Sequence, residues 1–392
     1  MQGWQDQLER LDQQGMRRRL KRLDSGAGTT VRYDGHDLLL LCSNNYLGLA
    51  EHPALVEAAV AATRTYGVGS GASRLVSGSL ASHHRLEERL ADFKGTAAAL
   101  LFNSGYAANT GILQGLFGPD DLIFSDALNH ASIIDGCRLS GARVLIYPHA
   151  DIDALRALMT REQGRRRQGR WLIVTDGVFS MDGDLAPLHE LCDLKEDFET
   201  LLMVDDAHGT GVLGNSGRGT AELLGCLGRI DLHMGTLGKG LGCAGAYLAA
   251  PRRVIDTLVN FSRPFIFSTS LPPAVPAAAL AALEIVNSDE GAELRRRLEQ
   301  NRALFAGALS SSGLDLMGSS TQIVPILTRD PVSTMKMTES LLERGLFLQG
   351  IRPPTVPEGA CRLRATVMAS HTPESLRRAA AEITSLFREE TI

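Results

Sequence analysis

Short runs of apolar residues recur between residues 45 and 285, and longer stretches with helical periodicity separate them. Because the runs are nearly continuous and bounded by polar turns, we expect each to be a buried strand. They are AAALLF (97–102), DLIF (121–124), RVLIY (143–147), WLIVT (171–175), TLLMV (200–204), DLHMG (231–235) and AYLAA (246–250). Among the intervening stretches, HRLEERLADFKG places Leu86, Leu90 and Phe93 on one helical face and ends in Gly95, a typical C-cap. This alternation predicts an α/β fold with a mainly parallel central sheet that helices cover on both faces.

The pattern changes after about residue 286, where charged and apolar segments alternate without the earlier regularity. We expect these segments to form a smaller α+β domain. They are a charged helix at 291–309, strand-like QIVPILT (322–328), a helix at 332–345, LFLQG (346–350), CRLRATVM (361–368) and a last helix from Thr372. The order Thr372-Pro373-Glu374 is a typical helix start, since threonine caps the first turn and proline fits its first position.

The N-terminal segment is polar, with Trp4, Leu8 and Leu11 at helical spacing. This spacing predicts a helix over residues 4–23 that ends in the basic run MRRRLKR, whose charges we expect on a solvated face. The chain is therefore expected to have three parts. They are an N-terminal helix and arm (1–44), a large domain (45–285) and a small C-terminal domain (286–392).

Composition narrows the class of protein. The 392 residues are 44% hydrophobic and 22% charged, which is ordinary for a soluble globular protein. The net charge of −5 argues against nucleic acid or an anionic membrane as partner. No apolar stretch is long enough to span a bilayer, and the polar, acid-containing N-terminus does not resemble a targeting peptide. Six scattered cysteines without a C-x-x-C pair indicate reduced thiols, so we expect a cytoplasmic protein.

Polar clusters follow three of the expected strands. They are TDGVFSMDGD (175–184), DDAHGTG (205–211) and GTLGKG (235–240). In parallel sheets the ligand lies beyond the carboxyl ends of the strands, so these clusters should share one crevice. Lys239 stands alone there among glycines, and Asp205 and His208 follow the preceding strand.

Two kinds of phosphate loop can be tested against Lys239. A Walker loop fails because counting back from Gly238 gives His233 at the first glycine position, and Gly240 replaces the hydroxyl residue. No G-x-G-x-x-G joins a first strand to a helix, so a dinucleotide fingerprint fails as well. A lysine that reacts covalently remains the better interpretation.

An isolated amine, a carboxylate and an imidazole at adjacent strand ends suit pyridoxal phosphate. Lys239 can hold the aldehyde as a Schiff base, and Asp205 can keep the pyridine nitrogen protonated. His208 can hydrogen-bond the phenolic oxygen. The glycine turn NSGYAAN (103–109) opens a helix whose backbone N–H groups can bind the phosphate, and Thr236 can add a hydroxyl.

Each of these residues also has an ordinary structural interpretation. An aspartate after a strand is more often a turn or cap residue, and His130 or Ser180 alone is more often a satisfied polar side chain. Asp205, Asp206 and His208 are also potential metal ligands, as in a metal-dependent hydrolase. No second histidine cluster completes such a site, so we expect no metal.

Six motifs along the chain resemble those of the α-oxoamine synthases. They are SNNYLGL (43–49), NHASIIDG (129–136), TDGVFSMDGD (175–184), MVDDAHGTGVLG (203–214), GTLGKGLG (235–242) and FSTSLPP (267–273). These are fold-type I pyridoxal phosphate enzymes that join an amino acid to an acyl thioester with loss of carbon dioxide. The resemblance implies that fold, that cofactor and a homodimer with active sites at the subunit interface.

The resemblance also implies roles for individual residues. Lys239 is the Schiff-base lysine and the base that removes the Cα proton, and Asp205 pairs with the pyridine nitrogen. His208 and Ser180 bind around the phenolic oxygen. His130 stacks on the ring and touches the substrate.

Further roles concern the phosphate and the substrates. Gly105, Tyr106 and Thr236 are implied to contact the phosphate, with Thr269 or Ser268 reaching across from the partner chain. The substrate contacts implied by the resemblance are Arg18, Asn44, Thr355 and Arg364. Three consecutive arginines at 17–19 leave the register of Arg18 open.

The motifs resemble two branches of the family. IRPPTVPEGACRLR (351–364) and GSGASRLVSG are similar to the branch that uses L-alanine and a pimeloyl thioester, carried by coenzyme A or a carrier protein, in biotin biosynthesis. SDALNHASIIDGCRLS and TDGVFSMDG are also similar to the branch that condenses glycine with acetyl-CoA. A protein that keeps the fold without turnover is a third interpretation, against which the intact lysine, aspartate and histidine argue.

Overall fold

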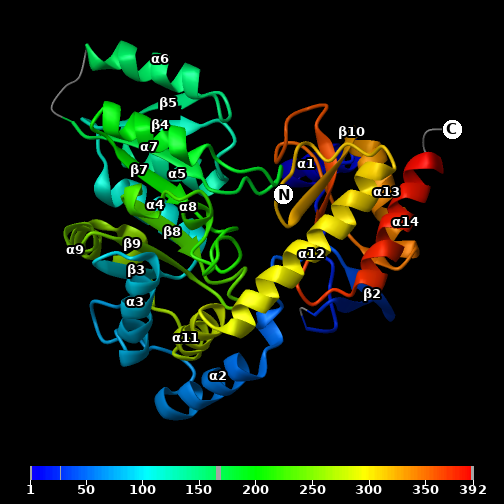
Figure 1. Ribbon diagram of the computed structural model, residues 1–392, viewed down its shortest axis with the longest axis horizontal. Coiled ribbons are helices and arrows are strands. Elements are labelled where there is room, and N and C mark those ends of the chain that lie inside the picture. Colours follow the sequence, from blue (N-terminus) through cyan, green and yellow to red (C-terminus); the bar gives the residue numbers. More distant parts are fainter. Residues whose placement is uncertain (1, 27, 165–168, 390–392) are drawn as a thin grey trace. The chain divides into compact units, whose positions relative to one another are not determined.

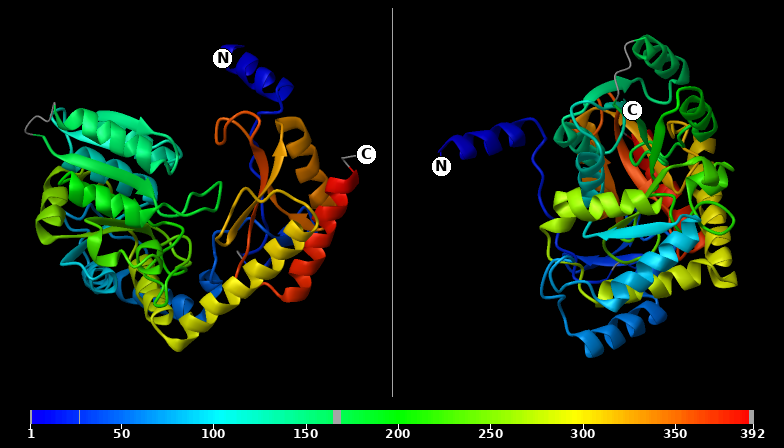
Figure 2. Two further views of the ribbon diagram at one scale, coloured as in Figure 1. Left: turned by 45° about the horizontal axis from the view of Figure 1, so that its top comes forward. Right: turned by 90° about the vertical axis from the view of Figure 1, so that its left-hand side faces the viewer.

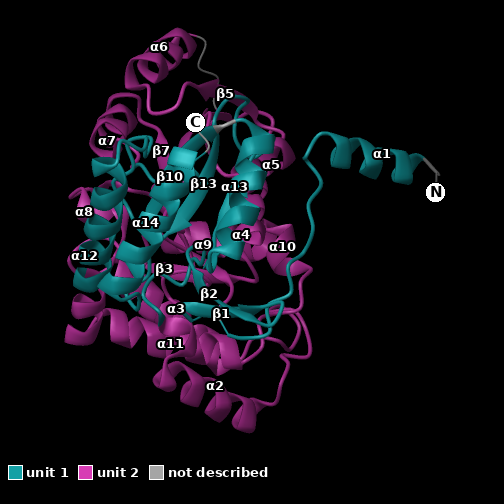
Figure 3. Ribbon diagram, turned by 90° about the vertical axis from the view of Figure 1, so that its right-hand side faces the viewer, with its two compact units in different colours: residues 1–48, 180–184, 296–392 teal, residues 49–179, 185–295 magenta. Residues whose placement is uncertain are grey.

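The computed structural model describes residues 2–26, 28–164 and 169–389 (Figure 1). The chain forms two compact units, each assembled from separate stretches of sequence (Figure 3). Unit 1 comprises residues 1–48, 180–184 and 296–392, and unit 2 comprises residues 49–179 and 185–295.

A seven-stranded sheet forms the centre of unit 2, in the order β3-β9-β8-β7-β6-β4-β5. Its strands are β3 (Ala98–Phe102), β4 (Leu122–Asp126), β5 (Arg143–Tyr147), β6 (Trp171–Asp176), β7 (Leu201–Asp205), β8 (Leu232–Thr236) and β9 (Ala246–Ala250). β9 pairs antiparallel with β3 and β8, and the remaining pairs are parallel. All seven strands expected from the apolar runs, and the mainly parallel sheet, are confirmed.

Helices cover both faces of this sheet (Figures 1 and 2). Successive residues of a strand point to opposite faces. Thus Val174 of β6 belongs to one apolar cluster with side chains of α4, α5 and α9, whereas Ile173 belongs to another with α6 and α7. The helical segments of unit 2 are η1 (Leu49–Glu51), α2 (Pro53–Tyr66), α3 (Ala81–Lys94), α4 (Gly105–Leu116), α5 (Ala131–Ser140), α6 (Ile152–Gln163), α7 (Leu188–Asp197), α8 (Thr220–Leu223), η2 (Leu227–Arg229), α9 (Arg252–Phe261), α10 (Arg263–Ile266) and α11 (Ala274–Val286).

Unit 1 is an α+β assembly with two small sheets, in the orders β1-β2-β11 and β10-β13-β12. Its strands are β1 (Thr30–Tyr33), β2 (His36–Leu40), β10 (Ile323–Arg329), β11 (Leu346–Phe347), β12 (Gln349–Ile351) and β13 (Cys361–Thr366). Its helices are α1 (Gln2–Gln13), α13 (Pro331–Glu343) and α14 (Pro373–Glu389), and most of α12 (Asp289–Ser311) also belongs to it. The smaller α+β part is confirmed, and the β1–β2 hairpin is an addition that the apolar pattern did not predict.

The N-terminal helix is shorter than predicted. The expected helix over 4–23 is wrong beyond residue 13, where α1 ends. Gly15 adopts a left-handed conformation (φ 64°), and the backbone N–H groups of Met16 and Arg17 turn back to the carbonyl of Leu11, at 2.7 and 3.1 Å. These bonds satisfy a terminal carbonyl and end the helix. The basic run therefore continues without helical structure rather than along a helix face.

Two further observations concern the chain as a whole. Among the residues that the structure describes, no helix is both long and apolar enough to cross a membrane. All six cysteines are free thiols.

His371 connects the packing of unit 1 to pH. It is 2% exposed, its Nδ1 accepts a hydrogen bond from the Met368 backbone, and its Nε2 lies 3.0 Å from the carbonyl oxygen of Leu40. Burial lowers the pKa of His371 to about 4. The folded protein therefore holds this ring neutral at pH values where an unfolded chain, with a pKa of about 6.5, already binds a proton.

We expect His371→Asn to reduce the loss of stability on acidification. As the pH falls from about 6.5 to about 4, only the unfolded parent binds the extra proton, so the parent loses stability through this group. Between pH 7 and pH 5 that loss is about 2 kcal/mol. Urea unfolding at the two pH values should show the parent losing about that much more stability than the variant. The exposed His36→Asn serves as control and should keep the parental slope; equal slopes for parent and His371→Asn would contradict the prediction.

Candidate active site

Lys239 and His208 meet at the carboxyl ends of β7 and β8. Lys239 Nζ lies 2.9 Å from His208 Nε2. The glycines around this lysine are required by close packing. A Cβ on Gly240 would lie 2.6 Å from the carbonyl oxygen of Thr210, and one on Gly235 would lie 2.5 Å from the hydroxyl of Tyr247. The loops after the two strands can therefore approach only because these positions lack side chains.

The carboxylate of Asp205 is held from two directions. It is 4% exposed, and it accepts hydrogen bonds from Asn109 Nδ2 at 2.7 Å and from the backbone N–H of Ala207 at 3.0 Å. Asn109 Nδ2 also lies 2.9 Å from the hydroxyl of Ser132. These contacts tie the end of β7 to α4 and α5, and hold a buried negative charge in one orientation.

His130 is the N-cap residue of α5, beside the same strand ends. Its backbone N–H donates to Asp176 at 2.8 Å, and its Nδ1 lies 2.7 Å from the hydroxyl of Ser132. Desolvation lowers the pKa of His130, Asp205 acts in the opposite direction, and the positive charge of Lys239 lowers it further. The ring is therefore mostly neutral at pH 7.

Asp176 is a site residue that the sequence analysis did not single out. It ends β6 directly opposite Asp205 in the parallel register, and it is buried. Burial, and then the negative charge of Asp205, raise the pKa of Asp176 well above its usual range. Its place in TDGVFSMDGD, at a strand end like Asp205, was the available signal. This carboxyl positions the backbone of His130.

The first turn of α4 has the properties of a phosphate cradle. The hydroxyl of Ser104 caps the helix by accepting from the backbone N–H of Ala107. The N–H groups of Gly105 and Tyr106 lie in the first turn, where a helix offers donors without internal acceptors. A Cβ on Gly105 would lie 2.9 Å from Thr236 Cγ2, so these two predicted phosphate contacts are neighbours.

Tyr106 and Thr269, two of the predicted phosphate contacts, also bond to other residues. The hydroxyl of Tyr106 bonds to Asp135, so Tyr106 contributes its backbone N–H, not its side chain, to the first-turn donors. Thr269 is exposed, and its carbonyl accepts from Asn103 Nδ2 at 2.7 Å.

Taken together, unit 2 offers an anion-binding helix start, a fixed carboxylate, a neutral imidazole and an amine. This donor set fits pyridoxal phosphate, which carries a phosphate, a pyridine nitrogen and an aldehyde. Among the described residues, no group of three or more histidine, cysteine, aspartate or glutamate side chains is arranged to hold a metal ion.

The predicted substrate contacts, apart from His130, and Ser180 lie in unit 1. Arg364 of β13 donates from Nε to the carbonyl of Ser180, and its Nη2 lies 3.5 Å from Asn44 Oδ1. Arg18 Nη2 lies 3.4 Å from the hydroxyl of Thr355. The structure thus brings these residues together in two groups, Arg364 with Ser180 and Asn44, and Arg18 with Thr355.

A basic cavity of about 860 Å³ surrounds the second group, with Arg17, Arg18, Arg352 and Thr355 in its wall. Arg352, which the sequence analysis missed, is 7% exposed and donates to the carbonyl of Arg17 at 2.9 Å. Its Nε has no hydrogen-bond partner among the described residues. A buried guanidinium with a spare donor is suited to a carboxylate or phosphate.

Comparison with known proteins agrees with this geometry. Residues 36–383 match the family model described as aminotransferase class I and II. The 8-amino-7-oxononanoate synthase of Geobacter metallireducens is 60% identical over 96% of this chain and 95% of its own length. The enzyme of that name from Geobacter sulfurreducens is 58% identical over 98% and 97%.

Solved structures give the same picture. The serine palmitoyltransferase of Sphingomonas wittichii superposes with a TM-score of 0.92 at 30% identity, covering 99% of this chain and 97% of that one. The 8-amino-7-oxononanoate synthase of Francisella tularensis superposes with a TM-score of 0.75 at 29% identity, covering 91% and 99%. The chain belongs to the aminotransferase class I and II family, with the fold-type I architecture and pyridoxal phosphate dependence of the α-oxoamine synthases.

Proposed function

We propose that this protein condenses L-alanine with a pimeloyl thioester, yielding 8-amino-7-oxononanoate, carbon dioxide and the free thiol carrier, in biotin biosynthesis. The observation that carries the proposal is the name 8-amino-7-oxononanoate synthase on relatives about 60% identical over nearly the whole chain. The site supports it, because an amine, a carboxylate and a helix N-terminus meet in unit 2, and arginines gather in unit 1.

When bound, pyridoxal phosphate supplies an electron sink for negative charge at the α-carbon of the amino acid. Asp205 keeps a proton on the pyridine nitrogen, because a fixed carboxylate favours the charged pyridinium. Asn109 holds that carboxylate. The N–H groups of Gly105 and Tyr106, with the hydroxyl of Thr236, bind the phosphate.

Lys239 attaches the cofactor and is the base that removes the proton from Cα of alanine. His208, at 2.9 Å from its Nζ, orients this amine, and with Ser180 serves the phenolic oxygen. The neutral ring of His130 packs against the cofactor ring and the substrate. Proton removal by a positioned amine is general base catalysis, which typically raises a reaction rate by about 10²–10⁴-fold.

The bond changes of the reaction balance as follows. The Cα of alanine attacks the thioester carbonyl carbon, and the C–S bond breaks as a thiolate leaves and takes a proton from solvent. The carboxyl group of alanine is then lost as carbon dioxide, and Lys239 returns a proton to Cα. Arg364 and Asn44 bind the alanine carboxylate. Arg18 and Thr355 bind the pimeloyl group, whose distal carboxylate can pair with a guanidinium.

We also propose that the enzyme is a cytoplasmic homodimer in which Thr269 or Ser268 reaches the partner's cofactor. Unit 2 exposes Val76, Phe261 and Phe267, which are 79%, 65% and 71% accessible. A second copy of the chain that covered these side chains would bury apolar surface that is now in contact with water. The free state of all six cysteines supports a reducing compartment.

We expect Lys239→Ala to abolish covalent cofactor attachment and to lower turnover at least about 10³-fold, because the variant lacks both the attaching amine and the base. Borohydride reduction followed by mass spectrometry of the intact protein should show the cofactor fixed to the parent only. The exposed Lys336→Ala controls for removal of a lysine and should behave as the parent. Normal turnover of Lys239→Ala would refute the assignment.

A substrate panel tests the reaction itself. Pimeloyl, shorter acyl and acetyl thioesters are crossed with alanine, glycine and serine, and thiol release gives kcat/KM for each pair. Alanine with a pimeloyl thioester should be preferred, and alanine should exceed glycine by about 10–100-fold, the usual value of one methyl group. Preference for glycine with acetyl-CoA would replace this function by that of the sister branch, and no thiol release from any pair would indicate a protein without turnover.

A mixed dimer tests the shared site. Thr269→Asp places a negative charge where we propose a phosphate contact, so it should be inactive alone, as should Lys239→Ala. If Thr269 contributes to the partner's site, subunits of the two variants exchanged at equal ratio should regain about a quarter of parental activity. About half of the dimers are then mixed, and each mixed dimer has one intact site of two. No recovery, or a monomer in sedimentation, would contradict the shared site.

A further inference from the structure

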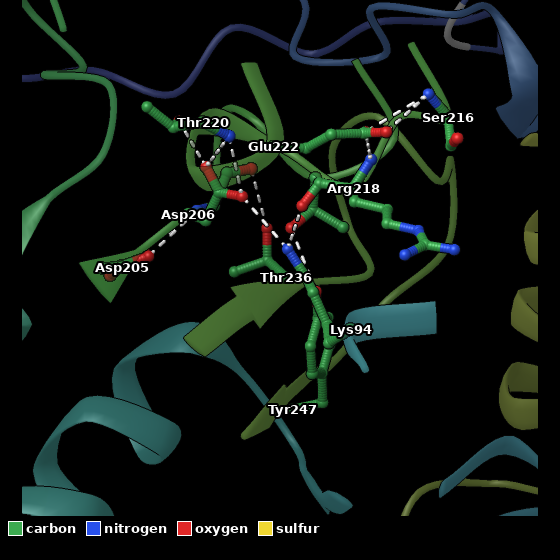
Figure 4. A network of polar contacts seen from close by, with 11 residues as sticks. Lys94, Asp205, Asp206, Ser216, Arg218, Thr220, Glu222, Thr236 and Tyr247 are labelled. Atoms are coloured by element: carbon green, nitrogen blue, oxygen red, sulfur yellow. Dashed lines mark hydrogen bonds and ion pairs between the residues drawn. The ribbon is translucent and has the colours of Figure 1, made fainter. Parts of the chain in front are cut away.

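Lys94 is the last residue of α3, and its charged side chain is 0% exposed. Lysine is almost never fully buried unless it is paired. Here Nζ donates to Asp206 Oδ2 at 3.1 Å and to the carbonyl oxygen of Arg218 at 2.6 Å (Figure 4). Asp206 is itself 3% exposed, so the two residues form a buried ion pair.

The carboxylate of Asp206 joins the two ends of one loop. It accepts from the backbone N–H of Thr220, at 3.1 and 3.2 Å to its two oxygens, and from the Thr220 hydroxyl at 2.6 Å. Asp206 begins the loop after β7, and Thr220 begins α8. The loop that contains His208 is therefore closed on a single charged group, which Lys94 neutralises (Figure 4).

The backbone packs against this carboxylate so closely that side chains are excluded. A Cβ on Gly219 would lie 1.5 Å from Asp206 Oδ2, and one on Gly209 would lie 2.1 Å from Oδ1. Gly219 also has a φ of 98°, which residues with a side chain rarely adopt. A shift of the Asp206 side chain would therefore displace the loop backbone on both sides of it.

The same short stretch of backbone carries Asp205 and His208, the two proposed cofactor residues on this turn. Asp205 and Asp206 are consecutive, and Asp205 bonds to Asn109 while Asp206 bonds to Lys94. The backbone N–H of Asp206 donates to Met234 of β8 at 2.9 Å, and the hydroxyl of Thr236 donates to the carbonyl of Ala207 at 3.3 Å. A displacement of Asp206 would therefore move the turn that carries Asp205 and His208 and that Thr236 contacts.

Lys94 retains its charge in this environment. Burial lowers the pKa of Lys94, but Tyr247 and then Asp206 raise it, and the net direction is upward. The hydroxyl of Tyr247 in turn lies 3.0 Å from the hydroxyl of Thr210, a residue of the same loop. The cation therefore faces groups that stabilise it throughout the neutral pH range.

We propose that Lys94 is a positioning residue for pyridoxal phosphate, acting through Asp206 on the turn that carries Asp205 and His208. The proposal rests on the cofactor, which the family shares, and not on the identity of the acyl substrate. If the substrate panel contradicts the proposed reaction, the role of Lys94 is unaffected. If the Lys94 variants bind the cofactor as the parent does, the proposed reaction is unaffected.

The first measurement is the affinity of the cofactor-free protein for pyridoxal phosphate, by equilibrium dialysis. The second is the pH midpoint at which the absorbance of the bound cofactor changes in the reloaded enzyme. Lys94→Met removes the charge and leaves Asp206 buried without its partner. It should weaken cofactor binding about tenfold or more and move the absorbance midpoint. The double variant Lys94→Met/Asp206→Asn removes both charges and keeps an acceptor for Thr220, so it should recover binding to within about threefold of the parent.

The control is Asp121→Asn, which also removes a buried carboxylate. Asp121 is 5% exposed and bonds to Arg170, but it precedes β4 at the opposite end of that strand from the site. It should lower the unfolding temperature without changing cofactor affinity. A folded Lys94→Met protein with parental affinity and absorbance midpoint would overturn the proposal. If Lys94→Met does not fold, Asp206→Asn is the deciding variant, and parental affinity there would overturn the proposal equally.

Discussion

The parallel pairing of β6, β7 and β8 is the constraint on which the rest of the site depends. Parallel strands end at the same edge, so Asp176, Asp205 and the loop that leads to Lys239 meet there. The edge concentrates carboxylates, and the surroundings compensate them. Asn109 and Ala207 bond Asp205, the backbone of His130 bonds Asp176, and buried Lys94 with Thr220 neutralises Asp206.

Two groups of the site, Asp205 and His130, differ in charge, and each charge has its own local cause. Hydrogen bonds fix the carboxylate of Asp205, whereas the ring of His130 is mostly neutral. Desolvation lowers the pKa of His130, and Lys239 reinforces that direction against Asp205. The cation that balances Asp206 comes from the last residue of α3, which is itself buried. Local packing therefore sets the charge of each group separately.

The sequence was informative wherever a feature depends on a local pattern. All seven strands of unit 2 follow continuous apolar runs, and the glycine after Lys94 caps α3 in a left-handed conformation as predicted. The helix end at residue 13 was missed because a single left-handed glycine outweighed the helical spacing. The sequence signal for the β1–β2 hairpin is the pair Asp34-Gly35, whose two residues both have positive φ angles. Asn109, Arg352 and Lys94 could not be assigned, because their roles depend on partners distant in sequence.

The division of unit 1 among three stretches of sequence also bears on how the protein is made. β2 pairs in parallel with β11, where Leu39 lies opposite Leu346, and the carbonyl of Leu40 contacts His371. A ribosome releases the first strands long before these partners exist, so unit 1 cannot complete its packing until synthesis is nearly finished. The β1–β2 hairpin must wait with an unpaired edge during that interval, which is the kind of surface that chaperones shield.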